Sequence, residues 1–227
     1  PDLKSAESLQ PYVERPRFIA VLRNPVDRMV SAYFWSVRVG QLPNQPINEA
    51  FKEFMNDEAG FPRRRDNRYL DELVRRGCYG LQLRPYLDRY GPESLLVLLY
   101  EDIQNDALDS VRKIYRFLEV DSNFVPESIN VRPKVNSYNR FLIRLQNAIP
   151  FGRRPVAKVL DYINRSIAPK GDRESPLADD IRSQLASLFR PQVVDTMDLL
   201  QELPTTGRPD DSDLLERWSV PERVERD

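Results

Sequence analysis

The apolar run Phe18–Leu22 restricts the fold of this chain more than any other stretch. It contains β-branched residues and is followed directly by Arg23, Asn24 and Pro25. A short run of this kind predicts a strand covered on both faces, as in a parallel sheet. Asn24 predicts an N-cap and Pro25 the first helical turn. The strand is therefore expected to pass at once into a helix that ends near Val37.

Further strands and helices follow the same alternating order. Residues 95–100 form a second apolar run and predict a second buried strand. Apolar residues at helical spacing predict a helix that Gly91 ends and another over 111–118. A later helix is expected to begin at Ser175-Pro176 and to be broken by Pro191. Strands alternating with helices predict an α/β fold with a parallel sheet.

Composition excludes several classes of function. The chain has 227 residues, with 34 Lys+Arg against 35 Asp+Glu. The chain as a whole therefore lacks the excess of positive charge that is typical of nucleic-acid-binding proteins. It has no histidine, and Cys78 is the one cysteine, which excludes a Ser-His-Asp triad, a histidine metal cage, zinc clusters and an internal disulfide. We find no run near the roughly 20 apolar residues of a membrane span. Because no signal peptide opens the chain either, we expect a cytoplasmic protein of undetermined oligomeric state.

A candidate anion site lies where the first strand meets its helix. Arg23 is placed at the carboxyl edge of the predicted sheet, where α/β proteins bind ligands. Arginine can hold a phosphate through two parallel hydrogen bonds, and a helix N-terminus adds N–H donors. Ser31, eight positions later, could donate its hydroxyl to the same anion. The alternatives are a structural salt bridge for Arg23 and a surface position for Ser31.

These residues resemble a motif of the sulfotransferases that use 3′-phosphoadenosine 5′-phosphosulfate (PAPS). The matching segment is Arg23-Asn24-Pro25-Val26-Asp27-Arg28 followed by Ser31-Ala32-Tyr33. In that family the arginine and the serine bind the 3′-phosphate of the donor, which implies that role for Arg23 and Ser31. Arg28 is expected to brace the helix, and Asp27 occupies the position of a capping-box acid. The resemblance implies a helix-rich fold with a P-loop-NTPase-like parallel β-sheet flanked by α-helices.

Two later segments are similar to the same family. Arg76-Gly77-Cys78-Tyr79 and the strand and acidic pair that follow it match the middle region of the family. Tyr79 is therefore either a donor contact or a core tyrosine. Lys170, Gly171 and Arg173 are similar to the basic loop that closes over the donor nucleotide, although Asp172 interrupts its register. A solvated basic loop is the alternative.

One element of the family is not visible in this sequence. The family carries a strand and a lysine-containing loop that hold the 5′-phosphosulfate, and residues 1–16 are too short to supply them. Lys4 loosely resembles a lysine of the family near the acceptor, or is simply exposed. The catalytic base stays unassigned.

The resemblance implies a sulfotransferase that moves a sulfuryl group from PAPS, without a metal, to a hydroxyl or amine acceptor. The acceptor is a glycan or a small molecule, and no nucleic acid or membrane partner is expected. The alternatives are a non-catalytic 3′-phosphoadenosine-nucleotide-binding protein, a truncated inactive fragment, and a nucleotide kinase, which the missing Gly-x-x-x-x-Gly-Lys loop disfavours. We expect an N-terminally incomplete domain over residues 1–203 and a polar tail over 204–227, anchored by Trp218.

Overall fold

The structure is a computed structural model that describes residues 14–38, 41–43, 45–56, 68–127, 129 and 177–220. The chain divides into two compact units. The single domain that the sequence predicts over residues 1–203 stays a prediction. The first unit comprises Pro1–Arg28, Val74–Val131 and Ser183–Asp227, and the second comprises Met29–Leu73 and Arg132–Arg182. Each unit is described separately below.

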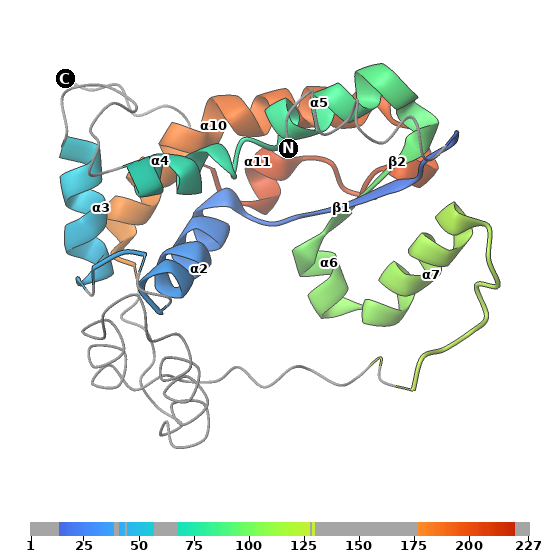
Figure 1. Ribbon diagram of the computed structural model, residues 1–227, viewed down its shortest axis with the longest axis horizontal. Coiled ribbons are helices and arrows are strands. Elements are labelled where there is room, and N and C mark those ends of the chain that lie inside the picture. The colour runs from blue at the N-terminus through green and yellow to red at the C-terminus, as the bar shows by residue number, and fades with distance from the viewer. Residues whose placement is uncertain are drawn as a thin grey trace, which may run out of the picture. The chain divides into compact units, whose positions relative to one another are not determined.

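The first unit contains a two-stranded parallel sheet (Figure 1). Strand β1 (Phe18–Leu22) pairs with β2 (Leu95–Leu99), with Leu22 opposite Leu99 at the carboxyl end. Both strands lie where the sequence predicts them, except that Tyr100 already belongs to the next helix. The fold class is thus confirmed: the described chain combines parallel strands with many helices.

The two strands differ in burial. Every residue of β2 is buried. On β1, by contrast, Ile19 is 39% exposed and Val21 is 50% exposed. The prediction that β1 is covered on both faces is therefore wrong for the described residues, because the face that Ile19 and Val21 share is partly exposed. A continuous apolar run does not distinguish a strand with two covered faces from one with a single covered face.

Helices follow the two strands along the chain in the order that the sequence predicts. Strand β1 leads into α2 (Pro25–Arg38), which continues into the second unit. The remaining helical elements of the first unit are α5 (Tyr79–Tyr90), η1 (Pro92–Ser94), α6 (Tyr100–Asn105), α7 (Ala107–Leu118), most of α10 (Asp179–Glu202), η2 (Thr205–Gly207) and α11 (Leu214–Arg217).

Helix α10 corrects one prediction from the sequence. It starts at Asp179 and continues through Pro191, which was expected to break it. Proline in a helix interior costs roughly 3 kcal/mol. Its neighbours Phe189 and Val193 are 0% and 2% exposed. Each such burial is worth about 1.5–3 kcal/mol, so two of them offset the proline.

Helices α5 and α10 pack closely because Gly80 has no side chain. A Cβ on Gly80 would lie 3.3 Å from the backbone of Asp195. At the same place the Gly80 amide donates to Thr196 Oγ1 at 3.2 Å. This contact fixes the start of α5, and therefore Tyr79, against α10.

The C-terminal segment also joins the core of the first unit. Trp218 is buried, as its role as an anchor predicts, and Leu214 and Val220 are buried as well. Arg217 forms an ion pair with Asp102 of α6. The described end of the chain therefore packs beside the carboxyl ends of the strands.

The described part of the second unit contains the continuation of α2, α3 (Ile47–Asn56) and most of α4 (Arg68–Arg75). Tyr33 and Phe51 are 2% and 0% exposed, and their ring centroids lie 5.3 Å apart. The Tyr33 hydroxyl donates to the Gln45 carbonyl at 3.0 Å. Ala178, just before α10, donates its amide to Asn48 Oδ1 at 2.9 Å.

Candidate functional site

The candidate site is the turn between β1 and α2, formed by Arg23 and Asn24. The Asn24 side chain accepts hydrogen bonds from the amides of Val26 at 3.0 Å and Asp27 at 3.4 Å. This is the N-cap that the sequence predicts. Pro25 has no N–H, and the Arg28 amide donates to the Asn24 carbonyl at 2.9 Å. All N–H groups of the first turn are thus engaged, so the expected backbone donors for an anion are not available.

The peptide group between Arg23 and Asn24 is held on both of its polar edges. The Tyr79 hydroxyl donates to the Arg23 carbonyl at 2.7 Å. The Asn24 amide donates to Glu101 Oε1 at 3.0 Å. The sequence suggests Asp27 as the acceptor of a capping box, whereas Glu101, 77 residues further along, accepts from this amide. We call Tyr79, Glu101 and the peptide that they hold the peptide clamp.

The Arg23 side chain lies against an aromatic ring at the same sheet edge. Its guanidinium carbon is 4.9 Å from the centroid of the Tyr100 ring, within the range of a cation–π contact. The sheet register explains this pairing. Because Leu22 is opposite Leu99, the residues that follow them, Arg23 and Tyr100, leave the sheet side by side. Among the described residues, no carboxylate forms an ion pair with Arg23.

Sequence reasoning missed Tyr100, Glu101 and Trp218 as neighbours of this turn. The Asn24 side-chain amide donates to the Trp218 carbonyl at 3.1 Å, across 194 residues. A signal for Tyr100 is present in the sequence, since it is the last residue of the second apolar run. Trp218 leaves no such signal, because its contact uses a backbone carbonyl.

Tyr79 is a buried residue whose environment keeps it neutral. It is 7% exposed, and burial raises its pKa to about 12, while Arg28 and its hydrogen bond to Arg23 act in the opposite direction. Burial in turn lowers the pKa of Arg28, and the nearby Tyr79 hydroxyl opposes that shift. Arg28 and the Tyr79 hydroxyl thus influence each other's protonation, and the expected role of Arg28 in bracing the helix stays a prediction. The Tyr79 hydroxyl therefore contacts Arg23 directly, through the hydrogen bond to its backbone carbonyl.

The other predicted site residues lie partly inside and partly outside the described part of the chain. Ser31 lies on α2 and is exposed. Lys4, Lys170, Gly171 and Arg173 lie outside the described residues, as does the whole basic loop. Among the described residues, no cluster of acidic, histidine or cysteine side chains could hold a metal ion. No helix in the described part of the chain is long and apolar enough to cross a membrane.

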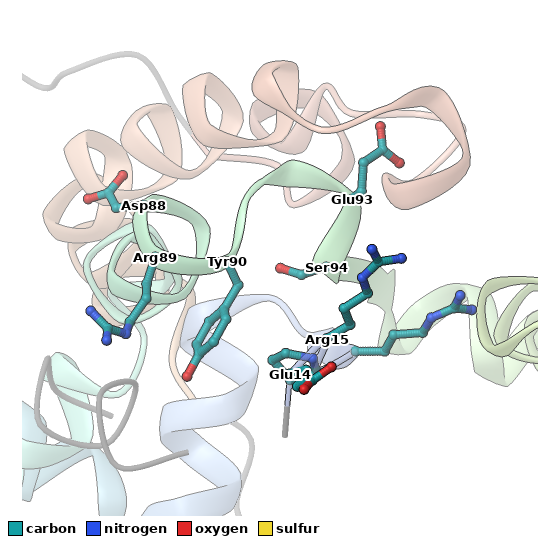
Figure 2. Close-up of a pocket in the computed structure, with 9 residues that line it drawn as sticks. Glu14, Arg15, Asp88, Arg89, Tyr90, Glu93 and Ser94 are labelled. Carbon is teal, nitrogen blue, oxygen red and sulfur yellow. The ribbon is translucent and has the colours of Figure 1, made fainter. Parts of the chain in front are cut away.

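A pocket of about 660 Å³ lies at the opposite end of the strands (Figure 2). It is lined by the residues that lead into β1 and β2 and by the end of α5. Figure 2 shows Glu14, Arg15, Asp88, Arg89 and Glu93 around it, so the lining contains both acidic and basic side chains. This mixture gives it no preference for an anion, and Arg23 does not line it.

Known proteins similar to this chain are sulfotransferases. Residues 4–138 match the family model for the sulfotransferase domain. The chain is 25% identical to mouse sulfotransferase 2A6 over 128 residues, which cover 56% of this chain and 39% of that protein. It is 26% identical to mouse sulfotransferase 2B1 over 137 residues, which cover 57% of this chain and 36% of that protein. The matched segments thus span well under half the length of these relatives.

A solved structure supports the same fold. The crystal structure of a sulfotransferase from Alicyclobacillus acidocaldarius superimposes with a TM-score of 0.57 at 21% identity, covering 96% of this chain and 63% of that one. At this identity the likeness concerns the fold alone. The family model, by contrast, covers more than half of the sequence and includes the whole Arg23 turn. The chain therefore belongs to the sulfotransferase family.

Proposed function

We propose that this chain acts in a sulfotransferase that transfers a sulfuryl group from PAPS to a hydroxyl or amine acceptor. In this proposal Arg23 and Ser31 bind the 3′-phosphate of the donor. One observation carries it: Arg23 lies at the carboxyl edge of the sheet, against Tyr100, without a carboxylate partner among the described residues. A structural arginine at such a position would be expected to pair with an acid.

The chemistry of the site fits a phosphate. Arg23 is half-buried, and its guanidinium offers N–H donors in a fork that matches two phosphate oxygens. The face of Tyr100 restricts the plane of that fork. Since the Asn24 side chain and the first-turn amides are engaged with one another, the charge of Arg23 supplies the attraction, and the dipole of α2 adds to it.

We infer the following roles in the reaction. PAPS, when bound, supplies the activated sulfuryl group that an acceptor attacks in line. Arg23 holds the far end of the donor and contributes position rather than bond making. Lys170, Gly171 and Arg173 would form a loop over the nucleotide. Lys4 would lie near the acceptor, a glycan or a small molecule. The base that removes the acceptor proton stays unassigned.

Ligand-induced stabilisation tests this proposal. A ligand at 100 times its Kd stabilises the folded state by about 2.7 kcal/mol. For a chain of this length each kcal/mol raises the melting temperature by about 2–4 °C. We therefore expect 3′-phosphoadenosine 5′-phosphate to raise the melting temperature by about 5–10 °C. Arg23→Ala should abolish this shift, and Ser31→Ala should reduce it.

Arg84→Ala is the matched control, because Arg84 is exposed and forms a bidentate pair with Glu202 away from the turn. It should retain the full shift. If the wild-type chain shows no shift with 3′-phosphoadenosine 5′-phosphate, the proposed donor site is wrong. Binding without sulfotransfer from PAPS to a panel of acceptors would instead favour the non-catalytic binding protein.

A further inference from the structure

We propose that Tyr79 and Glu101 are positioning residues that set the preference of this site for a nucleotide with a 3′-phosphate. They do so by fixing the Arg23–Asn24 peptide. This inference rests on the proposed function, because it assigns the anion that Arg23 binds. Neither residue would touch the nucleotide; both would act through Arg23.

The geometry of the peptide clamp carries the argument. A peptide unit is planar, so its C=O and N–H point to opposite edges of one plane. Tyr79 holds the C=O at 2.7 Å and Glu101 holds the N–H at 3.0 Å. Two hydrogen bonds at opposite edges prevent the plane from rotating. The direction in which the Arg23 side chain leaves the backbone is fixed as a consequence.

The two residues of the clamp are themselves held in place. Tyr79 is the first residue of α5, which the Gly80–Thr196 contact fixes against α10. The Tyr79 ring lies edge-on to Trp218, with centroids 6.2 Å apart. Glu101 is the second residue of α6, directly after the fully buried strand β2. Both groups therefore reach the peptide from rigid elements rather than from loops.

The clamp and Tyr100 together restrict one side chain at two points. The clamp fixes the backbone of Arg23, and the Tyr100 ring lies against its guanidinium. An arginine held in this way loses less conformational entropy when it binds an anion. The gain applies only to a ligand that reaches Arg23. The clamp should thus raise the affinity for a 3′-phosphate and leave the affinity for the rest of the nucleotide unchanged.

The test compares two nucleotides by isothermal titration calorimetry. For Tyr79→Phe we expect the Kd of 3′-phosphoadenosine 5′-phosphate to rise about three- to tenfold, the range of a hydrogen bond lost to a positioned group. The Kd of adenosine 5′-phosphate, which lacks the 3′-phosphate, should change less than twofold. In an Arg23→Ala background Tyr79→Phe should have no further effect on either Kd.

Two substitutions of Glu101 test the same inference independently, one that removes the acceptor and one that keeps it. Glu101→Leu removes the acceptor and should lower the preference for the 3′-phosphate in the same way. Glu101→Gln keeps an oxygen that can accept from Asn24, and it should restore most of the preference. This pair also decides the question if Tyr79→Phe fails to fold.

Tyr33→Phe is the matched control. Tyr33 is a buried tyrosine that donates to a backbone carbonyl, Gln45, at 3.0 Å, and burial likewise raises its pKa to about 12. Its removal should lower the melting temperature without changing the ratio of the two Kd values. A purely structural role for Tyr79 would give the same result as this control.

The outcomes separate the two proposals. If the wild-type chain binds neither nucleotide, the proposed function fails, and this inference fails with it. If Arg23→Ala loses the 3′-phosphate preference while Tyr79→Phe and Glu101→Leu retain it, the inference alone is overturned. An equal loss of affinity for both nucleotides in Tyr79→Phe would overturn it as well.

Discussion

A single methyl group added at Gly77 should destabilise the folded chain. It occupies the turn between α4 and α5, where its amide donates to the Val74 carbonyl at 2.7 Å. A Cβ on Gly77 would lie 2.7 Å from Cε1 of Phe189 and 3.2 Å from Cβ of Pro25. The ring of Phe189 is 0% exposed, so it cannot move into solvent. Gly77→Ala therefore adds volume to a core that has no room for it.

The magnitude follows from two opposing effects. Overpacking a close-packed core costs about 1–3 kcal/mol. Replacing glycine by alanine also restricts the unfolded chain, which returns about 0.4–1 kcal/mol. We therefore expect Gly77→Ala to lower the free energy of unfolding by roughly 1–2 kcal/mol. That corresponds to a loss of about 2–8 °C in melting temperature for a chain of this length.

Urea unfolding followed by circular dichroism measures this loss, with an unchanged m-value confirming that only stability has changed. Phe189→Leu provides the matched second site, because a smaller side chain makes space for the new methyl group. In the Gly77→Ala background Phe189→Leu should cost about 0.5–3 kcal/mol less than it does in the wild type. A Gly77→Ala midpoint equal to or above that of the wild type would refute the packing argument, as would strict additivity of the two substitutions.

Three further outcomes are expected from the same structure. Pro191 is exposed inside α10. Pro191→Ala should therefore raise the free energy of unfolding by up to about 3 kcal/mol, and the urea midpoint with it. A lower midpoint would contradict this. Burial raises the pKa values of Tyr33 and Tyr79 to about 12 from 10.0, so the folded chain keeps protons that the unfolded chain releases. The stability that these two protonated hydroxyls contribute is fully present below pH 10 and is lost as the pH rises towards 12. The fall in the urea midpoint between pH 9 and pH 11.5 should therefore be smaller in Tyr33→Phe or Tyr79→Phe than in the wild type. Burial also raises the pKa of the Cys78 thiol, so iodoacetamide at pH 8 should modify it rapidly in urea and slowly in the folded chain, as mass spectrometry would show.

Local patterns predicted much of the fold. The strands β1 and β2 and the helices α5 and α7 lie where apolar runs and periodicity place them, because each signal is contained within a few neighbouring residues. Helix α10 was not predicted as one element, because Pro191 usually ends a helix. Here the burial of Phe189 and Val193 outweighs the cost of that proline. The open face of β1 was missed because the cover of a strand depends on other elements.

The candidate site was only partly predictable for the same reason. Arg23 and the Asn24 cap follow from neighbouring residues in the sequence. The contacts that hold them come from Tyr79, Glu101 and Trp218, at separations of 56, 77 and 194 residues. Contacts over such distances leave no periodic signal. The proposed role of Ser31 in binding the 3′-phosphate stays a prediction, which the titrations above would decide.

The hydrogen bond from Asn24 to Trp218 has a consequence for the order of events during synthesis. Asn24 leaves the ribosome first, and its partner follows 194 residues later. At a translation rate of about 5–20 residues per second, the turn waits on the order of 10–40 s for its last contact. During that time β1 can already pair with β2, but the nascent turn lacks the contact with Trp218. A nascent chain stalled before Trp218 should therefore contain the paired strands and still bind the nucleotide poorly.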